Sequence, residues 1–256
     1  MIQFVEVEDA KLEYLDIPAR NPGRPELLFL HEGLGCVSLW RDFPVRVASS
    51  TGCRAVVYSR RGFGRSSPRK DRYTPRFVHD EALETLPALR AGLGIARPVL
   101  IGHSTGASMA LLHAASGRWP VAGVVAMAPL TFVEESNLES IRNAGALFAT
   151  TDLREKLARH HDDADAVFRG WHDIWLDPRF RSWNLARDLA GIRCALLAIL
   201  GANDEYSTPT QVDLIEKSAA RAARFERLEL AECGHAPHRD QPRAVLEAVT
   251  RFVYAV

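Results

Sequence analysis

The stretch Leu100-Ile101-Gly102-His103-Ser104-Thr105-Gly106 decides the fold of this chain. The residues before it, 97–101, form an apolar run typical of a buried strand, and a helical pattern follows at about 105–116. The pattern G-x-S-x-G therefore lies in the order strand, tight turn, helix. Its glycines allow a sharp turn in which the backbone lies close to its neighbours. Such a turn raises the Ser104 hydroxyl above the sheet, beside the first amides of the helix.

A serine hydroxyl is a weak nucleophile, so this arrangement requires a base and an orienting acid elsewhere in the chain. Residues 194–204 are an apolar strand that continues through a glycine to Asp204. Residues 226–235 run from another strand to a glycine and His235. The chain order Ser104, Asp204, His235 is one of the known orders of a catalytic triad. His103 is predicted to be a packed structural residue, because adjacent side chains point in different directions.

With these motifs the chain resembles the α/β-hydrolase superfamily of serine hydrolases. The motifs that carry the resemblance cover nearly its whole length: His31-Glu32-Gly33-Leu34-Gly35, Arg61-Gly62-Phe63-Gly64-Arg65-Ser66, Gly102 to Gly106, Asp204 and Gly234-His235. The resemblance implies that Ser104 is the nucleophile on a nucleophile elbow, His235 the base and Asp204 the orienting acid. The family pattern Gly-x-x-Asp favours Asp204 over its neighbour Glu205. It also favours His235 over His238 as the base.

The loop 31–35 departs from the family pattern H-G-x-x-G at one position, where Glu32 replaces glycine. The resemblance implies an oxyanion hole made by the amides of Gly33 and Thr105, with Leu34 as an alternative to Gly33. A carboxylate would oppose the negative charge that develops there. We therefore expect Glu32 to turn away and pair with an arginine such as Arg60 or Arg61. The alternative is that Glu32 positions a water molecule or a cationic group of the substrate.

Strand and helix patterns alternate along most of the chain, which predicts the α/β class with a doubly wound, mostly parallel eight-stranded sheet. The predicted strands lie at about 2–7, 12–17, 26–31, 54–59, 97–101, 121–127, 194–200 and 226–230. The predicted helices lie at about 38–50, 75–93, 105–116, 209–222 and 241–253.

Residues 130–191 interrupt this alternation, because they contain helical patterns rich in charge but no buried-strand run. They are predicted to form a helical cap inserted after the sixth strand, with residues 1–129 and 192–256 as the core. The cap lies over the carboxyl edge of the sheet, where open α/β sheets bind ligands. We expect the substrate to contact Leu34, Trp171, Trp175 and His238.

The composition of the chain limits the kinds of partner that we expect. A chain of 256 residues is the size of one domain with a small insertion, and 32 basic residues balance 32 acidic ones. The sequence has no basic stripe of the kind that binds nucleic acid, and no apolar run reaches membrane-spanning length. The four cysteines lie singly and are expected to be free thiols. The segment His160-His161-Asp162-Asp163 is expected to be a solvated charged face, because adjacent histidines on a helix diverge.

These observations favour a cytoplasmic serine esterase with a small-molecule substrate, no cofactor and no metal; a homo-oligomer is possible. The expected reaction is hydrolysis of a carboxylic ester or thioester of a small or medium acyl or aryl group through an acyl-enzyme. An alternative is hydrolysis of a C–C bond in a vinylogous diketone from ring cleavage, with His172, Arg169 and Arg179 as candidate polar groups. A distant alternative is an NADP-binding oxidoreductase, because Gly33, Gly35 and Arg60-Arg61 imitate a phosphate-binding turn. That alternative leaves the triad unexplained.

Overall fold

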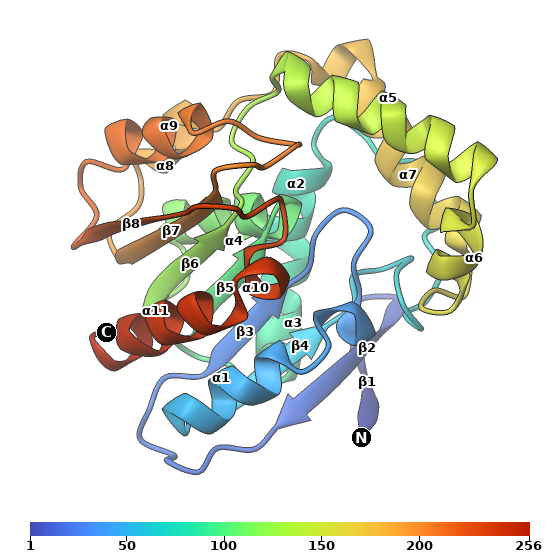
Figure 1. The fold of residues 1–256 in the computed structure, drawn as a ribbon. Helices are drawn as coiled ribbons and strands as arrows, with labels where there is room; N and C mark the ends of the chain where they lie inside the picture. Colours follow the sequence, from blue (N-terminus) through green and yellow to red (C-terminus); the bar gives the residue numbers. More distant parts are fainter.

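One sheet of eight strands, in the order β1-β2-β4-β3-β5-β6-β7-β8, forms the centre of the computed structural model, which describes residues 1–256 (Figure 1). The strands are β1 Ile2–Val7, β2 Ala10–Ile17, β3 Leu27–Leu30, β4 Ala55–Tyr58, β5 Val99–His103, β6 Gly123–Met127, β7 Ala195–Gly201 and β8 Phe225–Leu230. The pairs β1–β2 and β2–β4 are antiparallel, and the other neighbours are parallel. The predicted doubly wound, mostly parallel sheet is confirmed.

The central strands are buried on both faces, as their continuous apolar sequences predict. Helices α1 and α11 cover one face, and α3 and α4 cover the other (Figure 1). The neighbouring strands β3 and β5 are paired in register, with Leu30 opposite Gly102. The loops that follow these two strands therefore leave the same edge of the sheet side by side.

Two predicted helices are divided in the structure. The helix expected at 38–50 is a 3₁₀ turn, η1 Val37–Trp40, followed by α1 Phe43–Thr51, with Arg41 at a φ of 53° between them. The helix expected at 75–93 is α2 Phe77–Asp80, a π-helical turn η2 Glu81–Thr85 and α3 Leu86–Gly92. Pro87 has no amide hydrogen to continue the α-helical bonding pattern, and the π-helical turn accommodates this.

The remaining helices of the core agree more closely with the sequence patterns. They are α4 Thr105–Ala115, α9 Thr210–Ser218, α10 Pro237–Asp240 and α11 Pro242–Tyr254. Helix α9 ends four residues before the predicted end at about 222. No helix in the structure combines the length and the apolar character needed to span a bilayer.

Five helical elements lie between β6 and β7, in the segment that we call the helical insert, residues 130–191. They are α5 Glu135–Thr150, α6 Leu153–Ala158, α7 Ala164–Leu176, the 3₁₀ turn η3 Pro178–Phe180 and α8 Ala186–Leu189. Helices α5 and α7 lie beyond the sheet, whereas α8 lies beside α9 (Figure 1). The division between core and cap at residues 130 and 191 stays a prediction, because α8 packs against core helices.

Candidate active site

Ser104 lies on the tight turn between β5 and α4, and its backbone has the uncommon angles φ 52° and ψ −121°. Both flanking glycines are required by close backbone contacts. A Cβ atom on Gly102 would lie 2.5 Å from the Cα atom of Ala107, and one on Gly106 would lie 2.1 Å from the carbonyl oxygen of Leu30. The surrounding backbone therefore holds Ser104 in a conformation that non-glycine residues rarely adopt.

The side chains of Ser104, His235 and Asp204 form a continuous hydrogen-bonded chain. The Nε2 atom of His235 lies 2.9 Å from Ser104 Oγ, and its Nδ1 atom lies 2.8 Å from Asp204 Oδ1. A carboxylate only accepts hydrogen bonds, so Nδ1 carries the proton of the neutral ring. The lone pair on Nε2 then faces the serine hydroxyl, which is the tautomer that a general base requires.

The acid loop after β7 holds Asp204 as an anion. Burial alone would raise the pKa of Asp204, but hydrogen bonds from His235, Ser207 and Tyr206 bring it below its usual value. The backbone amides of Tyr206 and Ser207 donate to Oδ1 at 2.8 and 3.0 Å, and the Ser207 hydroxyl donates to Oδ2 at 2.7 Å. The neighbouring Glu205 instead accepts a hydrogen bond from the His235 amide at 3.2 Å.

Two backbone amides near Ser104 have no acceptor within the chain. Thr105 is the first residue of α4, so its amide has no intrahelical partner. The Gly33 amide, in the loop after β3, makes no hydrogen bond. Gly33 and Thr105 line the same cavity, which has a volume of about 10 Å³. Paired amide donors beside a nucleophile are the groups that stabilise a negatively charged oxygen.

Glu32 turns away from this cavity, but its partners differ from the expected ones. Its carboxylate lies 3.6 Å from Nδ1 of His103 and 3.9 Å from Nη2 of Arg239. It also lies against Gly35, where an added Cβ would be 2.2 Å from Oε2 of Glu32. The expected pairing with an arginine is confirmed, but the arginine is Arg239 and not Arg60 or Arg61, because the side chain of Glu32 leaves the loop toward β5 and α10.

The two arginines are occupied by other groups. The guanidinium of Arg60 donates to the backbone carbonyls of His31 and Glu32, the latter at 2.9 Å, and Arg61 pairs with Asp9 at 2.7 Å. Arg60 thus braces the backbone of the loop that carries Gly33.

The sequence pattern of the alpha/beta hydrolase family matches residues 27–248, which include all three members of the hydrogen-bonded chain. The chain belongs to the alpha/beta hydrolase family. Membership of this family supports hydrolase activity. A search of curated protein sequences found no match to this hydrolase.

Solved structures of several enzymes are similar to this hydrolase over its whole length. The proline iminopeptidase of Mycobacterium smegmatis is 16% identical with a TM-score of 0.75, and the match covers 100% of this chain and 98% of the other. The enol-lactonase of Burkholderia xenovorans is 20% identical with a TM-score of 0.77, covering 98% and 100%. A structure from work on carboxylesterases of Nitrososphaera gargenis is 18% identical with a TM-score of 0.76, covering 99% and 98%. At these identities the likeness concerns the fold.

The hydrolase brings two of the four expected substrate contacts near the loop that carries Gly33. Trp171 of α7 lies over Gly33, where an added Cβ would be 2.3 Å from its Cδ1 atom, and Leu34 packs in the same region. The structure does not bring Trp175 or His238 to this cavity. Trp175 lies one turn further along α7, where the helix already packs on the core, and it is 1% exposed. His238 is 5% exposed and packs against the ring of Trp40.

Tyr206 is a site residue that the sequence reasoning missed. Its ring centroid lies 4.8 Å from that of His235 and 6.3 Å from that of Trp171, so it connects the base with the helical insert. The available signal was its position two residues after Asp204, in a loop that must turn around the carboxylate.

The segment 160–163, which is part of the helical insert, contacts the core. His161 accepts a hydrogen bond from the Gly64 amide at 2.9 Å and donates one to the Leu34 carbonyl at 3.0 Å. Asp163 accepts from the Ala166 amide and caps α7. The expectation of a solvated charged face is wrong for His161, which is 2% exposed.

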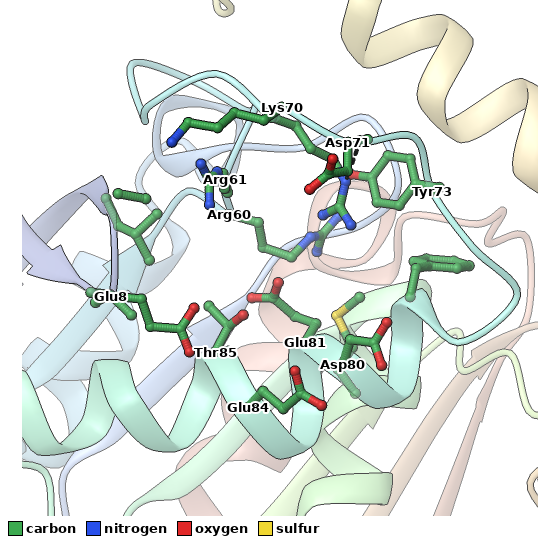
Figure 2. Close-up of a pocket in the computed structure, with 16 residues that line it drawn as sticks. Glu8, Arg60, Arg61, Lys70, Asp71, Tyr73, Asp80, Glu81, Glu84 and Thr85 are labelled. Carbon is green, nitrogen blue, oxygen red and sulfur yellow. Dashed lines mark hydrogen bonds between the residues drawn. The ribbon is translucent and has the colours of Figure 1, made fainter.

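A larger cavity, of about 260 Å³, lies between the loop that carries Arg60 and Arg61 and the helical turns α2 and η2 (Figure 2). Glu81 is buried at its floor and accepts a hydrogen bond from the Tyr58 hydroxyl at 2.9 Å. Burial raises the pKa of Glu81. Arg60, Tyr73 and Phe77 line both this cavity and the small one at Gly33 and Thr105. The two cavities are therefore adjacent.

Proposed function

We propose that this chain is a serine hydrolase that cleaves a carboxylic ester or thioester of a small or medium acyl or aryl group through an acyl-enzyme. The observation that carries the proposal is the Ser104–His235–Asp204 chain, with contacts of 2.9 and 2.8 Å. These lengths are within hydrogen-bond reach for proton transfer from nucleophile to base.

The reaction proceeds in two halves. Ser104 Oγ attacks the carbonyl carbon of the substrate while Nε2 of His235 takes the hydroxyl proton, and Asp204 stabilises the resulting imidazolium. The oxyanion accepts hydrogen bonds from the amides of Gly33 and Thr105. His235 then gives its proton to the leaving alcohol or thiol. Water attacks the acyl-enzyme with His235 again as base, which releases the acid and restores Ser104. Apart from the substrate and this water molecule, these steps use only groups of the chain.

The walls beside the oxyanion amides support a compact apolar substrate group. Aromatic and aliphatic side chains line most of the small cavity; they are Phe63, Tyr73, Phe77, Trp171 and Ile174. Its volume of about 10 Å³ is no more than a water molecule needs. Trp171 must therefore shift for an acyl group to enter.

Labelling with a fluorophosphonate tests this proposal without knowledge of the natural substrate. We expect the reagent to add its mass to the peptide that contains Ser104, and Ser104→Ala to abolish both labelling and ester turnover. Ser116→Ala, at the other end of α4, is the matched control and should keep both. Retention of more than about 1% of activity in pure Ser104→Ala protein contradicts covalent catalysis, because loss of a triad member costs several powers of ten.

A substrate panel tests the reaction class. It contains p-nitrophenyl esters, acyl thioesters, lactones and a dienoate from ring cleavage. We expect an ester or thioester to have the highest kcat/KM. If the dienoate exceeds every ester by about a hundredfold, which is about 2.7 kcal/mol of transition-state preference, the chain is a C–C hydrolase instead.

A further inference from the structure

His103, the residue before the nucleophile, lies between two groups that only accept hydrogen bonds. Its Nε2 atom is 2.6 Å from the backbone carbonyl oxygen of His235. Its Nδ1 atom is buried, donates no hydrogen bond and faces the Glu32 carboxylate at 3.6 Å. A carbonyl cannot donate, so Nε2 carries a proton, and a lone pair on Nδ1 would face a negative charge. A ring with a proton on each nitrogen donates to the His235 carbonyl and presents a positive charge to the Glu32 carboxylate.

Three other buried histidines have a different environment. His31 donates from Nδ1 to the Glu32 carbonyl and accepts at Nε2 from the Arg60 amide. His113 and His161 likewise each contact one acceptor and one donor. A neutral imidazole fits each of these three sites, because it has one donor and one acceptor. His103 is therefore unlike them, and the difference arises from Glu32.

The Glu32 carboxylate remains charged in this position. Burial would raise the pKa of Glu32, but the neighbouring His103 and Arg239 hold it well below its usual range. Arg239 lies 3.9 Å from Oε1 and donates to the Leu39 carbonyl at 2.7 Å, so it is fixed in place. The contact between His103 and the His235 carbonyl is as short as a charge-assisted hydrogen bond.

These contacts connect the three loops that form the candidate active site. Glu32 precedes Gly33 of the oxyanion loop, His103 precedes Ser104, and the His103 ring bonds to the backbone of His235 itself. We propose that Glu32 and His103 are positioning residues: the Glu32 carboxylate holds His103 as a doubly protonated ring, whose Nε2–H fixes the main chain of His235 between Asp204 and Ser104. This inference rests on the proposed function of the triad.

The charged and titratable groups around His103 come from three elements. Glu32 faces it from the loop after β3, and His235 precedes α10 with a ring-centroid distance of 5.3 Å. His238 of α10 lies at 5.0 Å, and Arg239 acts through Glu32. Burial lowers the pKa of His238 well below its usual value, so this ring stays neutral beside His103.

The ring protonation is measured directly by NMR of the imidazole nitrogens in the full-length protein at about pH 7.5, where an isolated histidine is mostly neutral. Loss of one set of signals in His103→Gln identifies His103. We expect protons on both of its nitrogens in the wild type and only on Nε2 in Glu32→Gln. A singly protonated His103 in the wild type overturns the proposal.

The positioning role is measured with Glu32→Gln, His103→Phe and His103→Gln. We expect kcat, or the rate of phosphonate labelling, to fall about tenfold to a hundredfold in Glu32→Gln with KM nearly unchanged, because small displacements of a catalytic group have effects of this size. The same rate should fall further in His103→Phe. Part of it should be recovered in His103→Gln, because the glutamine amide can donate to the His235 carbonyl. Glu247→Gln, which removes an exposed carboxylate of α11, is the matched control.

The outcomes separate this proposal from the proposed function. Equal activity of His103→Phe and His103→Gln indicates that the ring only fills space, and overturns it. The proton between His235 Nδ1 and Asp204 provides a readout that needs no turnover, and its NMR signal should shift in Glu32→Gln. An unchanged signal also overturns the proposal. If the wild type reacts with no ester and no phosphonate, the proposed function fails, while both NMR measurements still decide the Glu32–His103 pair.

Discussion

At the scale of single residues, the environment of each side chain sets its chemistry. Asp204 is surrounded by an imidazole, two amides and a hydroxyl that all donate to it, so it is held as an anion. Glu205, the next residue, has the same charge, but its carboxylate accepts a hydrogen bond from the backbone amide of His235. Two adjacent carboxylates thus have different tasks because adjacent side chains diverge.

Asp204→Asn should lower kcat by about 10⁴-fold while the fold is retained, a magnitude known for the same change in a serine protease triad. The asparagine amide can donate toward Nδ1 of His235, which favours the tautomer with the proton on Nε2. Steady-state kinetics measure the loss, and Asp213→Asn, which removes an exposed carboxylate of α9, serves as the control. A decrease smaller than tenfold would show that Asp204 does not orient the base.

At the scale of elements, the turn between β5 and α4 is packed against the end of β3. Gly106→Ala should destabilise the protein by about 3 kcal/mol or prevent folding, because the new Cβ would lie 2.1 Å from a backbone oxygen that cannot move away. Urea denaturation measures the free energy of unfolding. Gly23→Ala is the control, since nothing lies within 4 Å of the added Cβ. Equal stability of both variants contradicts the close approach.

Helix α7 limits the space at the proposed acyl site. Trp171 covers Gly33, whereas Trp175 packs on Phe180 in the core with a centroid distance of 5.1 Å. Removing the Trp171 indole should enlarge the site. A smaller ring at position 175 should mainly affect the stability of the fold.

Trp171→Ala should therefore shift the preference of kcat/KM toward longer p-nitrophenyl esters by about tenfold or more, roughly 1.4 kcal/mol. The control Trp175→Phe should keep the wild-type preference. The ratio of kcat/KM for hexanoate and acetate esters is the measurement. An unchanged ratio in Trp171→Ala would place the acyl group elsewhere, with the larger cavity in Figure 2 as the adjacent space.

At the scale of the whole molecule, buried neutral histidines make the fold sensitive to acid. Burial lowers the pKa of His31, His161 and His238, and it lowers that of His113 to about 4. Each of these groups takes up a proton in the unfolded chain at a higher pH than in the folded one. Acid therefore favours the unfolded state.

The free energy of unfolding should fall as the pH decreases from about 6.5 toward 4. His113 contributes up to about 2 kcal/mol of the loss by pH 5, because each unit of pKa difference corresponds to about 1.4 kcal/mol. Urea denaturation at pH 7 and pH 5 measures it. His113→Gln should show a smaller difference between the two values, whatever its absolute stability. An equal difference in variant and wild type would mean that His113 titrates normally in the folded protein.

Local patterns in the sequence predicted the sheet and the three residues Ser104, Asp204 and His235 that lie together in the structure. A buried parallel strand needs an unbroken apolar run, and a tight turn needs glycine where backbones meet. These are requirements on neighbouring residues, so they can be recognised without the fold. The family match to residues 27–248 agrees with them.

The tertiary structure alone decided which partner each polar side chain has. Glu32 could be expected to leave the oxyanion loop, but only the placement of β3 beside β5 and α10 brings it to His103 and Arg239. The same holds for Trp171 and Trp175, which are the same type of residue on the same helix but have different neighbours. Residues far apart in sequence meet only after the sheet has formed, and the direction of a side chain in a loop depends on backbone angles that no local pattern specifies.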